Sequence, residues 1–292
     1  MKHLYMVNRF SLGNKTDAVI RALEKASAEC GRDYEICDNH GPMQAKRLTQ
    51  NCHDENCAIT AIGGDGSIHL ILNDMVGTGS VLSFVPYGTG NDFYRTCRET
   101  LSDGILEADL IRVNNRYSIN AVCFGIDADI ANDDSFIHSR VIPKPLRYHT
   151  SVFYHFLTWK KGRPLTVECE GQTFEKAFTT VVAANARYYG GGYKICPDSV
   201  IDDGLMDVCI VEQLGKVNMA RTILSMKNAG HLQNPSLQML RTKKLVVSSR
   251  HPLQANLDGE SLTSNRFELE LIPKGVRLEY DSKFIELFNK AL

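Results

Sequence analysis

The chain has 292 residues, of which 43% are hydrophobic and 23% charged, and its formal net charge is −1. This composition is typical of a soluble globular protein with one large or two medium domains. The absence of any run of Lys and Arg argues against nucleic-acid binding, and no apolar stretch approaches the roughly 20 residues that span a bilayer. The nine cysteines are scattered without paired spacing, which favours reduced thiols in a cytoplasmic protein. Arg9 follows a short apolar run directly, which argues against a secretory signal.

The first part of the chain alternates between strand and helix patterns. Residues 4–7 and 34–37 are short apolar runs that predict strands. Between them, apolar residues recur at helical spacing over residues 18–26, and Gly31 marks the end of that helix. A further helix is predicted over residues 43–51, because a proline precedes it and suits the first helical position.

A glycine-rich turn follows the next predicted strand, residues 57–62. The turn reads GGDGS over residues 63–67 and leads into a helix whose apolar residues share one face up to Met75. Glycines let the backbone approach a ligand closely, and a helix start presents N–H groups and a partial positive charge to an anion. Asp65 can hold a divalent cation that bridges phosphate oxygens. The turn therefore predicts a phosphate site, with an ordinary strand-to-helix turn as the alternative.

A second loop strengthens the phosphate prediction. The strand predicted at residues 81–85 is followed directly by PYGTGNDF, residues 86–93. Loops that follow consecutive parallel strands meet at one edge of the sheet, so these two loops are expected to converge on one crevice. The alternation of strands and helices predicts a Rossmann-like α/β nucleotide-binding domain over residues 1–108.

From residue 109 onward, predicted strands outnumber helices. Residues 109–122 predict a β-hairpin, because Asn114 and Asn115 tolerate the left-handed turn that such a link needs. Further strands are predicted at residues 165–169, 177–184, 206–211, 244–248, 253–257, 266–272 and 276–280, with helices within 147–160 and at about 216–229. This pattern predicts a C-terminal antiparallel β-sandwich domain over residues 109–280.

Two acidic segments of this second half could carry chemistry. Asp258-Gly259-Glu260 lies between two predicted strands and would aim Glu260 outward, either as a working carboxylate or as a solvated turn residue. The other segment is PDSVIDDGLMD, residues 197–207, whose Asp-Asp-Gly turn offers the oxygen ligands that hard cations prefer. A turn without metal is the alternative there.

Taken together, these motifs resemble those of the diacylglycerol kinase-like lipid kinases. The family markers GGDGT and P-x-G-T-x-N-D correspond to residues 63–67 and 86–92, and the D-G-E and P-x-A-x-x-D-D-G-x-x-D segments correspond to residues 258–260 and 197–207. The chain departs from the family at two places. Arg9 stands where a proline is expected, and Leu70 stands where the family often has a glutamate.

The resemblance implies ATP and Mg²⁺ as cofactors and assigns roles to individual residues. It implies that Glu260 takes the proton from the acceptor hydroxyl. It also implies that Asp65 and Asp92 lie near the phosphates and Mg²⁺, and that Asp109 is an active-site aspartate, a strand-end cap being the alternative. The implied nucleotide site consists of Asn8, Gly63, Gly64, Asp65, Gly66, Ser67, Gly88, Thr89, Asn91 and Asp92. The implied ligands of a structural Mg²⁺ are the Asp203 side chain and the carbonyls of Val200 and Leu205.

The resemblance further implies that a last helix, residues 284–292, packs on the first domain and adds residues 281–292 to it. The predicted function is an ATP- and Mg²⁺-dependent lipid kinase that acts on diacylglycerol or a related lipid. A lipid substrate implies transient, peripheral membrane contact, for which the apolar and basic residues 136–147 are one candidate and an ordinary packed segment the alternative.

Alternatives to a lipid kinase are a kinase of the NAD kinase or phosphofructokinase type and a non-catalytic relative that binds lipid or nucleotide. The sequence leaves open which lipid is phosphorylated and whether the chain forms a homodimer.

Overall fold

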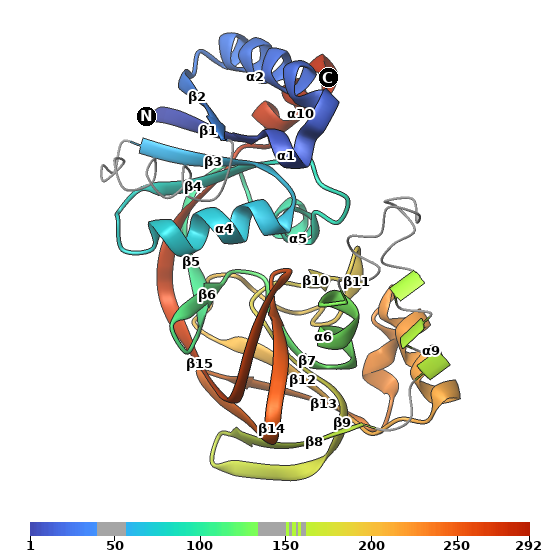
Figure 1. Cartoon of the computed structure of the whole chain (residues 1–292). Coiled ribbons are helices and arrows are strands. Elements are labelled where there is room, and N and C mark those ends of the chain that lie inside the picture. Colours follow the sequence, from blue (N-terminus) through green and yellow to red (C-terminus); the bar gives the residue numbers. More distant parts are fainter. Residues whose placement is uncertain (40–56, 134–149, 152–153, 156, 159–161) are drawn as a thin grey trace. The chain divides into compact units, whose positions relative to one another are not determined.

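The computed structural model describes residues 1–39, 57–133, 150–151, 154–155, 157–158 and 162–292 (Figure 1). The chain divides into two compact units, Met1–Ala108 with Lys274–Leu292, and Asp109–Pro273. The helix predicted at residues 43–51, the apolar and basic stretch 136–147 and most of the helix predicted within 147–160 lie outside the described residues.

The described part of the first unit is built on parallel strands in the order β2-β1-β3-β4. Its elements are β1 (Lys2–Asn8), α1 (Arg9–Leu12), the 3-10 helix η1 (Gly13–Lys15), α2 (Thr16–Cys30), β2 (Asp33–Asn39), β3 (Cys57–Gly63), α4 (Asp65–Met75), β4 (Val81–Pro86), α5 (Asp92–Thr100) and α10 (Ser282–Ala291). Helices α2 and α10 cover one side of this sheet, and α4 and α5 cover the other (Figure 1). Successive side chains of a strand point to opposite faces of the sheet. Val85 packs in the core with α2 and α10, whereas Phe84 contacts Phe93 of α5 edge to face.

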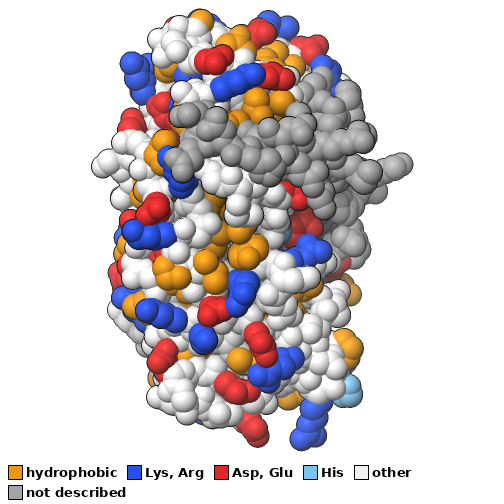
Figure 2. Space-filling view, turned by 90° about the vertical axis from the view of Figure 1, so that its left-hand side faces the viewer, with side chains coloured by type: hydrophobic (Ala, Val, Ile, Leu, Met, Phe, Trp, Pro, Cys, Tyr) orange, Lys and Arg blue, Asp and Glu red, His pale blue; other side chains and the backbone are white. Residues whose placement is uncertain are grey.

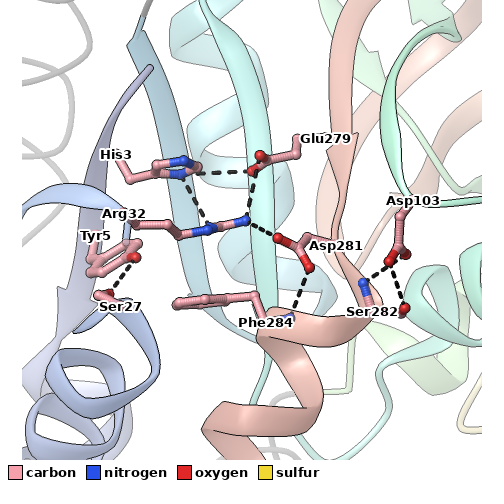
Figure 3. A network of polar contacts seen from close by, with 9 residues as sticks. All are labelled: His3, Tyr5, Ser27, Arg32, Asp103, Glu279, Asp281, Ser282 and Phe284. Atoms are coloured by element: carbon pink, nitrogen blue, oxygen red, sulfur yellow. Dashed lines mark hydrogen bonds and ion pairs between the residues drawn. The ribbon is translucent and has the colours of Figure 1, made fainter. Parts of the chain in front are cut away.

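The C-terminal helix is held in this unit by a polar network around Arg32 (Figure 3). The Arg32 guanidinium donates to Asp281 Oδ2 at 2.6 Å and lies 4.0 Å from the ring centroid of Phe284. Asp281 also caps α10, because its Oδ1 accepts the Phe284 N–H at 2.8 Å. Burial and the nearby Arg32 charge lower the pKa of His3 to about 4, so that His3 is neutral near pH 7 and can accept a hydrogen bond from Arg32. Helix α10 is therefore part of the core of the first unit.

The second unit consists mainly of antiparallel strands, in the order β13-β12-β9-β7-β14-β15. Its elements are β5 (Gly104–Val113, which begins in the first unit), β6 (Arg116–Ser118), β7 (Ala121–Gly125), α6 (Ile126–Ala131), β8 (Arg163–Cys169), β9 (Gln172–Ala184), β10 (Tyr188–Tyr189), β11 (Tyr193–Lys194), β12 (Met206–Glu212), α9 (Lys216–Met226), η2 (Gly230–Gln233), β13 (Leu237–Thr242), β14 (Lys244–Leu257) and β15 (Glu260–Tyr280, which ends in the first unit). Strand β8 pairs with both β9 and β14.

Alternate residues of the central strands enter two different cores. In β9, Val181 and Ala183 pack in a core made by strand residues, whereas Val182 and Ala184 pack in a core that includes residues of α6 and α9. Because side chains alternate across a strand, one strand can serve both cores only when nearly every residue is apolar. This explains the continuous apolar run of residues 181–184.

The hairpin predicted at residues 109–122 is confirmed as far as Ser118, since Val113 pairs with Arg116 and Asn114 adopts the left-handed conformation with φ 54°. Its predicted end is wrong, because Ala121 and Val122 belong to β7 and pair with β9 instead. Two predicted pairs of strands are single strands in the structure. Strand β14 is continuous, with a register shift between Ser248 and Leu253. Strand β15 runs to residue 280, and its Arg277 pairs in parallel with β4, so residues 274–280 group with the first unit rather than with the second.

Seven of the described cysteines are free thiols. Cys57 is in a disulfide, so the expectation of reduced thiols throughout the chain is wrong at this residue. No helix in the described part of the chain is long and apolar enough to cross a membrane.

Candidate active site

The predicted nucleotide loops leave the same edge of the sheet in the first unit. Strands β1, β3 and β4 run parallel and end at Asn8, Gly63 and Pro86, and Gly63 lies opposite Pro86 in the register. Just beyond the strand ends, the Tyr87 N–H donates to the Gly63 carbonyl at 2.8 Å. The structure therefore brings these loops together, as expected for the carboxyl ends of parallel strands.

The two loops touch through their glycines. A Cβ atom added to Gly88 would lie 2.5 Å from the Gly64 Cα and 2.9 Å from the Gly64 nitrogen. A Cβ atom added to Gly63 would lie 2.2 Å from the Oγ of Ser67, so this hydroxyl lies directly over the Gly63 backbone. A side chain at Gly88 would push the loops apart, and one at Gly63 would displace Ser67 within its own loop, which gives both glycines a physical reason.

The carboxylate of Asp65 ties the first loop to the helix that follows the second. Its Oδ2 accepts the N–H of Asp92 and its Oδ1 accepts the N–H of Phe93, each at 3.0 Å. These N–H groups lie at the start of α5, where a negative charge is favourable. The sequence predicts Asp65 as a cation ligand, and the structure adds a role in fixing both loops.

The side chain of Asn91 closes the second loop on itself. Its Nδ2 donates to the Gly88 carbonyl at 2.9 Å, and its Oδ1 accepts the Gly88 N–H at 3.0 Å. The backbone of Asn91 has φ 54°, a conformation that asparagine tolerates better than most residues. Next to it, Asp92 is buried and lies 3.6 Å from the Arg95 guanidinium, while Thr89 is exposed.

The first turn of α4 presents its backbone to open space. Gly64 is the N-cap residue and makes no side-chain cap hydrogen bond, and a Cβ atom on Gly66 would meet nothing within 4 Å. Helix starts of this kind attract anions, because their N–H groups and the helix dipole both point outward. The geometry of residues 63–67 therefore fits a phosphate group.

In the second unit, Asp109 holds the acidic loop 197–207. Its Oδ2 accepts the Gly204 N–H at 2.7 Å, and its own N–H donates to the Ile201 carbonyl at 2.7 Å. The Nδ2 of Asn185 donates to the Asp109 carbonyl at 2.8 Å. Asp109 is only 1% exposed, so in this structure its carboxylate positions the loop.

A buried carboxylate that the sequence reading missed lies two residues before Glu260. Asp258 accepts a hydrogen bond from Ser118 Oγ at 2.6 Å and from the N–H groups of residues 119–121 at 2.9, 3.1 and 2.9 Å. Its left-handed φ of 51° shows why Asp-Gly predicted a turn. The partners are 137–140 residues away along the chain, and no local pattern points to them.

Glu260 follows this turn as the first residue of β15. It pairs with Leu257 across the hairpin and is exposed. The turn is fixed from a second side, because the Gly259 N–H donates to Asn256 Oδ1 at 3.0 Å. Glu260 therefore extends from a firmly held turn toward solvent, a position open to an external hydroxyl group.

In the loop expected to bind Mg²⁺, residues 197–207, an arginine already balances the negative charge of the aspartates. Asp203 Oδ1 accepts the Leu205 N–H at 3.1 Å, Asp203 Oδ2 bonds to Arg241, and Arg241 also lies 3.2 Å from Asp207. The carboxylate and the carbonyls of Val200 and Leu205 suit a hard cation, and a carboxylate oxygen can accept more than one partner. The donor set therefore fits Mg²⁺, but as a weakly held ion, since Arg241 competes for the charge.

The candidate residues thus form two groups. The loops at residues 63–67 and 88–92 and the end of β1 belong to the first unit, and Asp109, the loop 200–205 and Glu260 belong to the second. Among the described residues, no three His, Cys, Asp or Glu side chains cluster in a way that could hold a metal ion.

Comparison with known protein families assigns both parts of the chain. The family model of the diacylglycerol kinase catalytic domain matches residues 2–121. The model of the YegS C-terminal NAD kinase beta sandwich-like domain matches residues 120–279, more than half of the chain. The prediction of a C-terminal β-sandwich is thereby confirmed.

Individual relatives agree with these matches. A probable lipid kinase YegS-like protein of Alcanivorax borkumensis is 26% identical over 238 residues, covering 75% of this chain and 77% of the relative. A diacylglycerol kinase of Staphylococcus aureus (strain bovine RF122 / ET3-1) is 25% identical over 269 residues, covering 87% of this chain and 84% of the relative. Among solved structures, a diacylglycerol kinase from Bacillus anthracis str. Sterne has the same fold, with a TM-score of 0.71 at 18% identity over 96% of this chain and 97% of that one.

We predict that Asp65→Asn lowers the stability of the protein. The Asp65 carboxylate accepts two backbone N–H groups, one on each oxygen. An asparagine side chain has only one oxygen, so its NH₂ group would face the second N–H. The loss of one charge-assisted hydrogen bond should cost about 2 kcal/mol, or roughly 4–8 °C in melting temperature. The matched control is Asp17→Asn on α2, where the carboxylate is 72% exposed. A melting temperature equal to that of the wild type would show that the Asp65 bonds do not hold the loops.

We also predict that Arg241 determines how the acidic loop responds to Mg²⁺. The wild type should melt at nearly the same temperature in EDTA and in millimolar Mg²⁺, because Arg241 supplies the positive charge. In Arg241→Gln, the melting temperature should fall in EDTA and recover in part with Mg²⁺, since an ion bound only by the folded state stabilises it. The double variant Asp203→Asn/Arg241→Gln should show no recovery. Recovery in the double variant would place the ion elsewhere.

Proposed function

Because the chain belongs to the diacylglycerol kinase-like lipid kinases, a family of phosphotransferases, we propose that it transfers the γ-phosphate of ATP to a hydroxyl group of diacylglycerol or a related lipid. The observation that supports this most is the pair of loops at residues 63–67 and 88–92, which touch through glycines beside the uncapped start of α4. We also propose that the first unit is a Rossmann-like domain and that it binds the ATP.

Within the first unit, the first turn of α4 would bind phosphate through backbone N–H groups. The Gly64–Gly88 contact keeps the two loops at a fixed separation, and the Ser67 hydroxyl offers one further donor near the Gly63 backbone. Asn8 ends the neighbouring strand at the same edge. These groups would align the nucleotide, which is the main requirement of phosphoryl transfer.

Mg²⁺ bound with ATP would neutralise charge on the phosphate oxygens. Asp65 and Asp92 are the carboxylates of these loops and would be its partners. Asp65 would at the same time keep the loops in place through its bonds to the start of α5.

In the second unit, Glu260 would take the proton from the acceptor hydroxyl. A lipid alcohol is a poor nucleophile at neutral pH and needs such a base. Asp258 and Asn256 would position Glu260 by fixing the turn before it. Asp109 would act as a positioning residue for the loop 197–207. The lipid substrate implies transient, peripheral contact with a membrane, and ATP implies a cytoplasmic location.

The alternative enzymes and the non-catalytic alternative are separated by one assay. Purified protein with Mg²⁺ and radiolabelled ATP is offered mixed micelles of extracted lipids, and in parallel NAD and fructose 6-phosphate. The proposal expects label in a lipid product. Label in NAD or in the sugar phosphate would contradict it, and so would the absence of any labelled product.

We predict that Glu260→Gln lowers turnover of the lipid substrate by about 10²–10⁴-fold, the usual contribution of a general base. The substitution preserves size and removes basicity. The dissociation constant for ATP and the melting temperature should match the wild type, because neither the nucleotide loops nor the Asp258 bonds involve this carboxylate.

A matched control is Glu175→Gln, an exposed glutamate of β9, which should leave turnover unchanged. Near-normal turnover in Glu260→Gln would make Glu260 only a turn residue. Loss of ATP affinity with unchanged turnover at saturation would place it on the nucleotide.

A further inference from the structure

Helix α9 of the second unit has one face in the core and one face without a partner among the described residues. Met219, Thr222 and Met226 are buried, and the two methionines pack in the core that α9 shares with the strands. On the outer face, Val217 is 66% exposed and Leu224 is 73% exposed. They are seven residues apart, so they lie two helical turns from each other on one side of the helix.

Further apolar side chains lie beside the start of α9. The Lys216 Nζ donates to the Leu157 carbonyl at 2.5 Å, which places residues 157–158 next to the helix (Figure 1). Leu157 is 52% exposed and Tyr154, one helical turn before it, is 47% exposed. Scattered exposed apolar residues need no explanation, but here two lie on α9 and two on the segment bonded to its first residue, so four large apolar side chains are exposed on or beside one helix. We call these four residues the α9 patch.

The charges that α9 itself carries are of one sign. None of the 34 acidic residues of the chain lies between residues 213 and 257, whereas seven Lys and Arg residues do. Three of the seven, Lys216, Arg221 and Lys227, are exposed on or directly after α9. By contrast, acidic and basic side chains are interspersed on the face drawn in Figure 2.

Acidic groups near α9 do not cancel this charge, because they have hydrogen-bonding or ion-pair partners of their own. Asp129 of α6 is held by Arg163 at 2.8 Å. Asp133 lies 2.9 Å from His155, and Glu212 lies 2.6 Å from Lys176. Over the part of the chain that the structure describes, the surface around the α9 patch is therefore apolar and positively charged.

An apolar surface with a basic border fits the boundary of an anionic bilayer. Apolar side chains enter the acyl region, and Lys and Arg remain with the acidic headgroups. A second copy of the chain fits poorly, because a symmetric contact would bring the patch and its basic residues against themselves. The basic residues of the two copies would repel each other at such a contact, which makes the contact unfavourable.

We infer that the α9 patch, with Lys216, Arg221 and Lys227, is the surface by which this protein docks on anionic membranes. The inference rests on the proposed function, since a lipid acceptor resides in a bilayer and the enzyme must reach it there. It assigns the membrane contact to α9, a segment different from the stretch 136–147 considered from the sequence.

The test is co-sedimentation of the full chain with vesicles of phosphatidylcholine and phosphatidylglycerol, and with vesicles of phosphatidylcholine alone. The wild type should bind the anionic vesicles more tightly, and added salt should weaken this binding. Leu224→Asp should weaken binding by about tenfold or more, and Arg221→Glu by about fivefold for each unit of charge removed. The matched controls, Ile105→Asp on β5 and Arg21→Glu on α2, alter exposed residues elsewhere and should bind as the wild type does.

Three outcomes would overturn the inference. The first is a wild type that does not bind anionic vesicles, and the second is equal binding by Leu224→Asp and the wild type. The third is a wild-type dimer in sedimentation velocity that Leu224→Asp dissociates without any change in vesicle binding, which would assign the patch to contact between copies.

Failure of the inference and failure of the proposed function give different results. Phosphorylation of lipid dispersed in neutral detergent does not require docking, so Leu224→Asp should retain wild-type activity there. A wild type that phosphorylates no lipid in detergent contradicts the proposed function, while the vesicle result still decides the role of α9.

Discussion

The Asp65 carboxylate, through its bonds to the Asp92 and Phe93 N–H groups, is the interaction on which the candidate nucleotide site depends. It satisfies the start of α5 and fixes that helix against the loop at residues 63–67. The start of α4 lacks a comparable side-chain cap and lies beside open space at Gly66. Of the two neighbouring helix starts, one is thus occupied by a carboxylate of the protein and the other is suited to an anion from outside.

Asp258 does for the second unit what Asp65 does for the first. Both carboxylates accept backbone N–H groups from segments distant in sequence, and both stand next to the residue that the chemistry would use. Asp258 holds residues 118–121 and the turn that carries Glu260, while Asp65 holds the loop that carries Gly66 and Ser67. A carboxylate bound in this way is costly to leave without its partners, so each fixes a loop more firmly than turn propensity alone could. The exposed Glu260 can then remain free for an incoming hydroxyl group.

Local sequence patterns predicted the elements well, because strands, helix ends and turns depend on neighbours in the chain. The GGDGS turn, the end of α2 at Gly31 and the left-handed Asn114 follow from residue chemistry at these positions. The pairing of Asp258 with residues 118–121 could not be predicted, because it depends on which strands become neighbours in the sheet. For the same reason, the pairing of Arg241 with Asp203, 38 residues away, could not be predicted. The exposure of the outer face of α9 could not be predicted either, because its apolar residues follow the same helical period as those of a core helix.

Binding of a nucleotide phosphate at the first turn of α4 can be measured by isothermal titration of Mg·ATP into wild type and Gly66→Ala. A methyl group on Gly66 would enter space that the protein leaves open, so the fold and melting temperature should be retained. If the phosphate binds there, ATP should bind the variant about tenfold or more weakly, because the methyl group occupies the place of the phosphate. Gly215→Ala, at another glycine with nothing within 4 Å, should bind as the wild type does. Equal ATP affinity in Gly66→Ala and wild type would show that the phosphate does not bind at this turn.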